Sequence, residues 1–121
     1  MNPNIFVFGS NTEGRHGKGA ALYAKMHCGA KNGQPMGLQG NSYAIITKNL
    51  NPKLGKYGYR SIPLSKILEQ LKELAQFADQ NPHLTFFMTK IGTGNSGYTN
   101  EEIKALFDQI DWTENVILPD W

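Results

Sequence analysis

The chain has 121 residues, which suits one average domain and leaves no room for a second. Apolar residues make up 40% and charged residues 18%, a balance that excludes disordered and fibrous classes. The formal net charge is +2, and the 12 Lys and Arg residues are scattered along the sequence, which disfavours nucleic acid as a partner.

Metal, disulfide and membrane signals are weak. The one cysteine, Cys28, excludes an internal disulfide, and His16, His27 and His83 are too far apart for a zinc signature. The apolar run at 5–8 is too short for a signal sequence or a membrane span. We therefore expect a cytoplasmic protein without a metal, a cofactor or a membrane partner, and the sequence leaves its oligomeric state open.

The first predicted unit is a strand, a glycine-rich loop and a helix. Residues 5–8 form a wholly apolar, β-rich run that ends at Gly9, as expected for a strand buried on both faces. From about Gly17 the pattern becomes helical and continues to Cys28, where Gly29 provides a C-terminal stop.

The middle of the chain contains many glycines and then one clear helix. Within 29–63 we predict only a short strand at 42–47. From Leu64 to Ala78 the apolar residues recur at the three- and four-residue spacing of an amphipathic helix. Asn81 and Pro82 end this helix, and 84–89 reads as a buried strand.

The strand, loop and helix unit then appears a second time. A glycine-rich loop occupies 91–98, and Thr99 with Glu102 forms a capping box for a helix that runs to about Gln109. A last strand is expected at 115–118. The repeated unit predicts a single α/β domain with a mixed, largely parallel sheet flanked by helices.

Two glycine-rich loops at the carboxyl ends of strands predict an anion site. Glycine lets consecutive N–H groups converge on a phosphate, and helix N-termini favour negative charge. The first loop, however, has Arg15 and His16 where a P-loop needs Lys and Ser or Thr. It also has Leu22 where a dinucleotide fingerprint needs its third glycine. Neither an ATPase nor a dehydrogenase is supported.

The sequence resembles the macro domains, and in particular a compact macro-like branch found in bacteria and their phages. Five segments carry the likeness: 6–11 (FVFGSN), 14–21 (GRHGKGAA), 37–43 (GLQGNSY), 91–98 (IGTGNSGY, followed by Thr99 and Glu102) and 116–119 (VILP). They span most of the chain. The resemblance implies a three-layer macro-like domain that binds ADP-ribose.

The resemblance also implies a site. Asn11 and 17–21 would lie beside the distal ribose, and 92–98 would wrap the diphosphate. The residues expected to bind ligand are Gly9, Ser10, Asn11, Arg15, His16, Gly17, Lys18, Gly19, Ala20, Gln39, Gly92, Thr93, Gly94, Asn95, Ser96, Gly97 and Tyr98. The chain lacks the early acidic residue with which many macro domains select adenine, so the base stays open.

Four of these residues have alternative readings. Tyr98 would stack on the ligand or make a core contact. Lys18 would face phosphate or solvent, or act as a nucleophile. His16 would contact the ligand, occupy a turn or serve as a general base. Lys90, just before the second loop, would meet phosphate or solvent. Gln39 would read the nucleotide or simply occupy a turn.

Three functions follow from this pattern. The first is a binding module for ADP-ribose or a related signalling nucleotide, such as cyclic ADP-ribose or a cyclic oligonucleotide. The phage association of the branch implies ligand capture as a counter to host defence. The second is a small hydrolase of an ADP-ribosyl or phosphodiester bond that uses Asn11, His16 and Lys18. The third is a protein-interaction domain without a ligand, with Trp112 and Trp121 at a partner surface or in the protein's own core.

Overall fold

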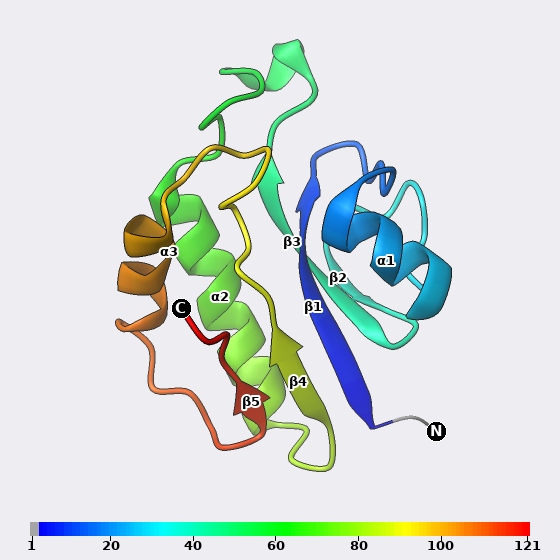
Figure 1. Cartoon of the computed structure of the whole chain (residues 1–121), viewed down its shortest axis with the longest axis vertical. Helices are drawn as coiled ribbons and strands as arrows, with labels where there is room; N and C mark the ends of the chain where they lie inside the picture. Colours follow the sequence, from blue (N-terminus) through cyan, green and yellow to red (C-terminus); the bar gives the residue numbers. More distant parts are fainter. Residues whose placement is uncertain (1–2) are drawn as a thin grey trace.

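A five-stranded sheet forms the centre of the molecule (Figure 1). The computed structural model describes residues 3–121. Its strands, in spatial order, are β2 (Gly37–Gln39), β3 (Ser42–Lys48), β1 (Asn4–Asn11), β4 (Thr85–Met88) and β5 (Val116–Ile117). Strand β2 is antiparallel to β3, and every other pairing is parallel. The sheet is mixed and largely parallel, as the sequence predicts.

Helices cover both faces of this sheet and make a three-layer α/β domain. Helix α1 (Gly19–His27) lies on one side, and α2 (Leu64–Asp79) and α3 (Asn100–Phe107) lie on the other (Figure 1). A short 3-10 helix, η1 (Pro52–Leu54), stands at one end of the molecule. The predicted fold class is confirmed.

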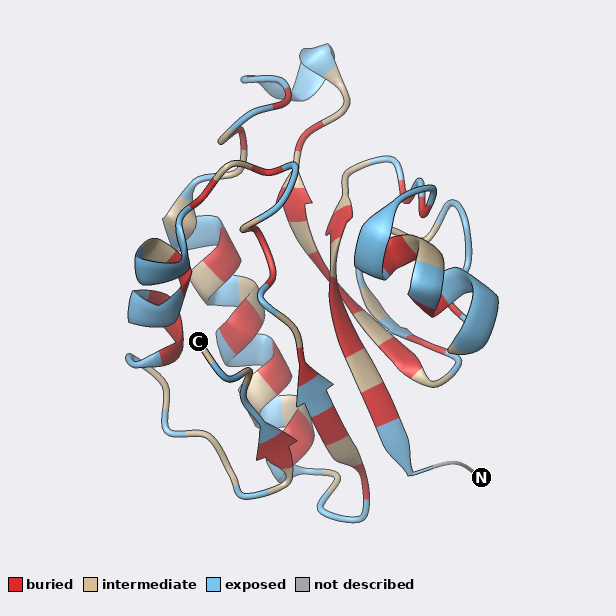
Figure 2. Ribbon diagram, viewed as in Figure 1, coloured by how far each residue is buried: buried red, intermediate tan, exposed pale blue. Residues whose placement is uncertain are grey.

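Two apolar clusters hold the layers together. The larger one packs α2 and α3 against the sheet, and α2 contributes Ile67, Leu71 and Leu74, which are fully buried. The smaller one joins α1 to the other face through Phe8 and Ala24. Figure 2 shows the buried residues as a stripe along α2 and along most of β1. Strand β1 is therefore buried on both faces, as its unbroken apolar run predicts.

The predicted elements agree with the structure apart from their boundaries and two omissions. The helix expected from about Gly17 begins at Gly19, because Lys18 is extended. The strand predicted at 5–8 continues to Asn11, since its pairing with β3 continues beyond Gly9. Thr99 and Glu102 form the predicted capping box. Strand β2 and the 3-10 helix η1, of three residues each, were not predicted.

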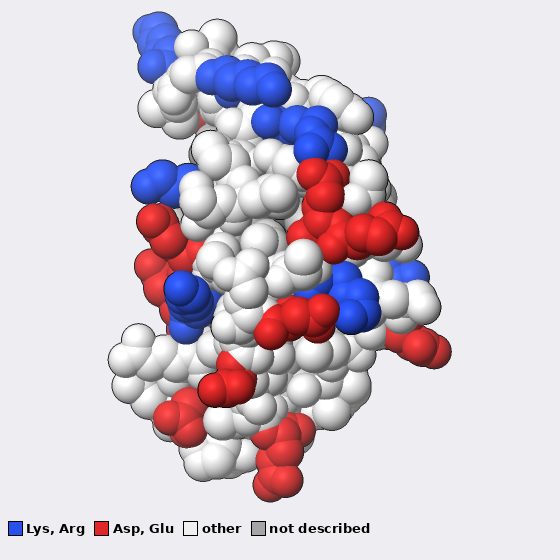
Figure 3. All heavy atoms as spheres, turned by 90° about the vertical axis from the view of Figure 1, so that its left-hand side faces the viewer, with Lys and Arg blue, Asp and Glu red and all other residues white. Residues whose placement is uncertain are grey.

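Charge is distributed unevenly over the surface. On the face covered by α2 and α3, acidic and basic side chains intermingle, but mainly basic groups lie at the end of the molecule that carries η1 (Figure 3). Among residues 3–121, no helix is long and apolar enough to cross a membrane. Within the same residues, no group of three or more His, Cys, Asp or Glu side chains could hold a metal ion.

Candidate functional site

A cavity of about 800 Å³ opens at the carboxyl edge of the three parallel strands β1, β3 and β4. The loop after β1 and the loop after β4 lie at this same end of the molecule (Figure 1). Its lining consists of Gly9, Ser10, Asn11, Arg15, Gly17, Lys18, Gly19, Ala20, Ala21, Thr47, Lys48, Leu50, Thr89, Lys90, Ile91, Gly92, Thr93, Gly94, Asn95 and Ser96. The two predicted glycine-rich loops therefore meet across one cavity.

The first loop is held in shape by the side chain of Asn11. Its amide oxygen accepts hydrogen bonds from the backbone N–H groups of Glu13 (3.2 Å) and Arg15 (3.0 Å), and its amide nitrogen donates to the Arg15 carbonyl (2.9 Å). The Gly14 carbonyl accepts from the N–H of Gly33 (2.9 Å). The Asn11 side chain thus shapes the loop that carries Arg15.

The N-terminus of α1 faces the cavity without a cap. Lys18 occupies the N-cap position, and its side chain makes no capping hydrogen bond. The first N–H groups of a helix have no partner within the helix, and those of Gly19, Ala20 and Ala21 make no hydrogen bond among the described residues. All three residues line the cavity. Free N–H groups and the helix dipole here favour a negatively charged ligand.

The second loop offers a similar set of donors. It is closed by backbone hydrogen bonds from Tyr98 N–H to the Gly92 carbonyl (3.0 Å) and from Gly97 N–H to the Gly94 carbonyl (3.1 Å). The N–H groups of Gly94, Asn95 and Ser96 have no acceptor within residues 3–121. The turn therefore presents three consecutive N–H groups beside the cavity, an arrangement typical of anion-binding nests.

Strand β3 joins the two loops at the floor of the cavity. The Thr47 hydroxyl lies 2.8 Å from the Ser96 hydroxyl and donates to the Ser10 carbonyl at 3.3 Å. Ser10, Thr47 and Ser96 are all buried. This network ties the ends of β1 and β3 to the second loop and fixes the width of the cavity.

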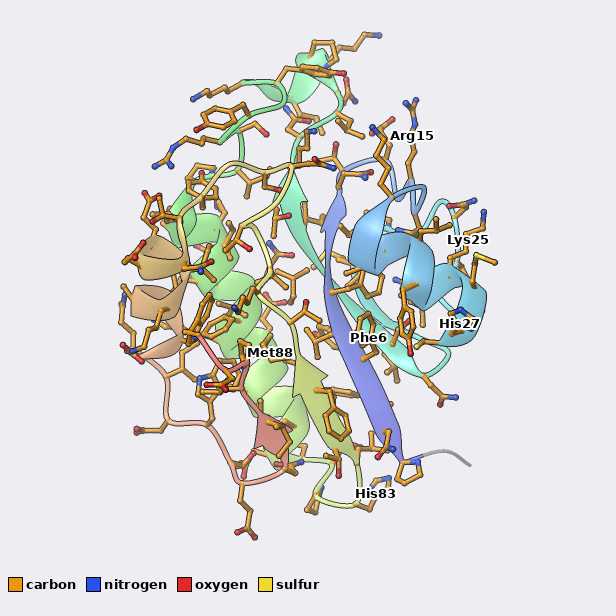
Figure 4. All side chains as sticks on the ribbon, viewed as in Figure 1. Phe6, Arg15, Lys25, His27, His83 and Met88 are labelled. Atoms are coloured by element: carbon orange, nitrogen blue, oxygen red, sulfur yellow. The ribbon has the colours of Figure 1, made fainter. Side chains whose placement is uncertain are left out.

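The cavity is lined by cations and by no carboxylate of the described chain. Arg15, Lys18, Lys48 and Lys90 contribute to the lining, and none of them takes part in an ion pair among residues 3–121. Lys90 lies over the ring of Trp121, 5.6 Å from its centroid. In Figure 4, Arg15 extends from the loop after β1 at the cavity end, away from Lys25 and His27. The positive charge of the lining would attract an anion more than a cation.

Contacts made by Arg60 hold the second glycine-rich loop in place. Arg60 makes a two-pronged ion pair with Glu102 and donates to the Gly97 carbonyl (3.1 Å). Its backbone N–H donates to the Ser96 carbonyl (2.7 Å). The hydrogen bond from Arg60, together with that from the Thr99 N–H, lowers the pKa of Glu102 to about 2. The start of α3 and the 58–61 turn thus fix the loop in place.

Thirteen of the predicted ligand-binding residues line the cavity: Gly9, Ser10, Asn11, Arg15, Gly17, Lys18, Gly19, Ala20, Gly92, Thr93, Gly94, Asn95 and Ser96. His16, Gln39, Gly97 and Tyr98 do not. Gly97 is covered by the Tyr59 ring instead. Tyr98 is buried in the larger core cluster and donates through its hydroxyl to the Ile62 carbonyl. Of its two readings, the structure favours the core contact.

His16 and Gln39 form a buried polar contact outside the cavity. His16 is 1% exposed, and its Nε2 lies 3.2 Å from the Gln39 Oε1 and 3.2 Å from the Gln34 carbonyl. Gln39 also accepts from the Lys31 N–H (2.8 Å). These side chains brace the first loop against 31–39. The predicted catalytic set of Asn11, His16 and Lys18 is therefore not assembled around the cavity.

The lining also includes residues that the sequence did not single out as a site. Thr47, Lys48, Leu50, Thr89 and Ile91 belong to it, as does Lys90, which the sequence placed against phosphate or solvent. Most of them follow or end β3 and β4. The rule that ligands bind at the carboxyl ends of parallel strands would have found them, had the order of the strands been known.

The fold and the cavity define a small three-layer α/β domain with a positively charged site at the carboxyl edge of its parallel strands. A protein of unknown function from Bacteroides thetaiotaomicron has a similar structure, with a TM-score of 0.55 and 18% sequence identity over 98% of this chain and 89% of that one. This similarity concerns the fold alone. No family model and no curated protein matches the chain. The likeness to macro domains stays a prediction.

Proposed function

We propose that this protein binds a small phosphate-bearing nucleotide, ADP-ribose or a related signalling nucleotide such as cyclic ADP-ribose, between its two glycine-rich loops. One observation supports this above all. Within residues 3–121, four cations without an ion pair and two groups of backbone N–H donors without an acceptor surround a cavity whose lining has no carboxylate. About 800 Å³ also falls in the range of small-molecule sites, roughly 300–1,000 Å³.

Binding has more support than hydrolysis. Hydrolysis of an ADP-ribosyl or phosphodiester bond needs a general base or an activated nucleophile at the reacting atoms. No histidine or carboxylate of the described chain lines the cavity, and the Asn11 side chain is engaged with its own loop. A binder that leaves its ligand intact would sequester a signal, which is the counter-defence role that the resemblance implies.

Calorimetric titration with ADP-ribose, cyclic ADP-ribose isomers and cyclic dinucleotides tests the proposal. Chromatography of the recovered ligand then separates capture from turnover. We expect saturable binding and an unaltered ligand. An altered ligand would establish the hydrolase, and the absence of heat with every nucleotide would refute the proposal and favour the protein-interaction domain.

Gly94 provides a sharp variant for the same titration. Its backbone conformation is open to any residue, and a Cβ built on it meets nothing within 4 Å. Gly94→Leu should therefore fold normally but fill space beside the free N–H groups and weaken nucleotide binding at least tenfold. Gly94→Ala is the matched small variant and should bind nearly as well as the wild type. Equal affinity of all three proteins would place the ligand elsewhere.

The cavity lysines provide an independent variant. Removing a charged hydrogen-bond donor typically costs about 1.5–3 kcal/mol, so Lys48→Ala should weaken binding about tenfold or more. Lys72→Ala, on the exposed side of α2, removes the same charge outside the cavity and should change nothing. If both variants lost the same affinity, the attraction would come from net charge rather than from this site.

A further inference from the structure

The segment at 49–60, between β3 and α2, stands beside the cavity and carries η1 (Figure 1). We call it the 49–60 loop. It follows directly on Lys48, and both Lys48 and Leu50 line the cavity. The loop closes on itself, because the Gly58 N–H donates to the Asn49 carbonyl (2.8 Å) and the Asn49 side chain donates to the Lys56 carbonyl (2.7 Å).

Hydrogen bonds hold the 49–60 loop in a defined conformation. Asn49 is buried, and its N–H donates to the Ser61 hydroxyl (2.7 Å). At the other end, Arg60 bonds to Ser96 and Gly97 of the second glycine-rich loop. The Tyr59 ring packs on Gly97 so closely that an added Cβ would come within 2.2 Å of it. The backbone that carries the exposed side chains of the loop is therefore held in place.

Those exposed side chains are cationic and aromatic. Leu54, Tyr57 and Tyr59 are 64%, 58% and 65% exposed. Lys53 and Lys56 are exposed and form no ion pair among the described residues, and the loop contains no acidic residue. The loop thus exposes aromatic and apolar side chains beside cations that have no ion pair among the described residues. Such a surface suits a partner with aromatic rings and negative charge.

The fold gathers positive charge at this end. Four cations line the cavity and three belong to the 49–60 loop, so seven of the twelve Lys and Arg residues lie here, and of these only Arg60 forms an ion pair among the described residues. Figure 3 shows mainly basic groups at the end of the molecule that carries η1. Among the carboxylates, Glu102 is paired with Arg60, while Glu13 and Glu101 are exposed to solvent. The sequence disfavoured nucleic acid because its cations are scattered; the structure brings them together.

We propose that the natural ligand is the end of a single-stranded nucleic acid: its terminal phosphate-bearing nucleotide occupies the cavity, and the neighbouring nucleotides cross the 49–60 loop. This inference rests on the proposed nucleotide cavity. Lys53 and Lys56 bind the backbone phosphates, and Tyr57 and Tyr59 stack on bases. Proteins that bind single strands combine the same two elements, a positive track and aromatic platforms.

Fluorescence anisotropy with labelled single-stranded 8-mers of DNA and RNA tests the inference, with and without a 5′- or 3′-terminal phosphate. The same protein is titrated calorimetrically with ADP-ribose. We expect the phosphorylated 8-mer to bind at least tenfold more tightly than ADP-ribose, and the terminal phosphate to contribute to its affinity. Each neutralised phosphate of a single strand contributes roughly −0.7 to the logarithmic salt slope. Lys53→Ala/Lys56→Ala should therefore reduce the slope by about 1.4.

Variants separate the loop from the cavity. Tyr57→Ala should weaken the 8-mer about tenfold, the usual loss for one stacked base, while Tyr57→Phe keeps the ring and the affinity. The Tyr57 side chain is 58% exposed, so neither change should disturb the fold. Both should leave ADP-ribose binding unchanged. Lys25→Ala/Lys72→Ala removes two exposed cations elsewhere and should alter the salt slope little.

Several results would overturn the inference. ADP-ribose binding without tighter 8-mer binding would refute it and leave the proposed function standing, whereas no binding of either would refute both. If Tyr57→Ala weakened ADP-ribose and the 8-mer equally, Tyr57 would belong to the mononucleotide site. If polyglutamate competed as well as the 8-mer, the attraction would be that of charge alone. If the terminal phosphate made no difference to the affinity, the strand end would not occupy the cavity.

Discussion

Replacing Gly14 by alanine should destabilise the protein strongly. In the sequence, Gly14 is indistinguishable from the other glycines of the predicted phosphate loop. Gly14 is buried and has a φ of +64°, in the left-handed region that favours glycine. A Cβ built on it would lie 2.7 Å from the backbone nitrogen of Gln34 and 2.8 Å from the carbonyl carbon of Gly33. Both neighbours are backbone atoms and cannot swing aside.

The magnitude follows from these two effects. A left-handed conformation costs a non-glycine residue roughly 1–2 kcal/mol. Pushing packed backbone apart by several tenths of an ångström adds about 1–3 kcal/mol. Gly14→Ala should therefore lower the free energy of unfolding by about 2–5 kcal/mol. For a chain of 121 residues, an unfolding entropy near 2.1 cal/mol/K per residue makes this about 8–20 °C in Tm.

Gly94→Ala is the control for this experiment. Its φ lies outside the left-handed region and its Cβ would point into open space, so the free energy of unfolding should change by less than about 1 kcal/mol. Urea denaturation and thermal melting, both followed by circular dichroism, measure the two variants side by side. A loss below 1 kcal/mol for Gly14→Ala, or equal losses at the two positions, would refute the reasoning.

Three further changes test the frame around the cavity. The pKa of Glu102 in the folded protein, about 2, lies below its ordinary 4.5, so its ionised form stabilises the protein above pH 4.5, and this stabilisation is lost as the pH falls toward 2. The urea midpoint should therefore depend on pH more steeply in the wild type than in Glu102→Gln. Parallel pH profiles of the two proteins would contradict this. Asn49→Ala removes three side-chain hydrogen bonds and should lower the free energy of unfolding by about 1–3 kcal/mol. Amide hydrogen exchange across 50–58 should become faster. Unchanged exchange would show that other contacts hold the 49–60 loop. Leu71→Ala should cost about 2–5 kcal/mol in the same denaturation assay, against less than 0.5 kcal/mol for the adjacent, exposed Lys72→Ala.

Local patterns were enough to predict most of the elements. The apolar spacing from Leu64 to Ala78 and the capping box at Thr99 and Glu102 are properties of a few neighbouring residues, and the structure has both helices. Strand β2 went unpredicted because three residues carry no periodicity, and its existence depends on pairing with β3.

The candidate site was predicted only where local patterns were sufficient. Glycines that follow a strand were assigned to loops, and most of these residues line the cavity. Lys48 and Lys90 reach the same cavity because β3 and β4 flank β1 on its two sides, and no local pattern specifies that order. The role of His16 was equally hidden, since its partner Gln39 belongs to the short strand β2.

The sequence by itself determined the α/β class, the amphipathic helix and the two glycine-rich loops, because each depends on spacing within one segment. Only the tertiary structure decided which glycines are packed against backbone and which border open space, and which cations share one cavity. It also collected scattered lysines at one end of the molecule. These properties depend on strand order and on side-chain direction, which arise when distant segments pack together.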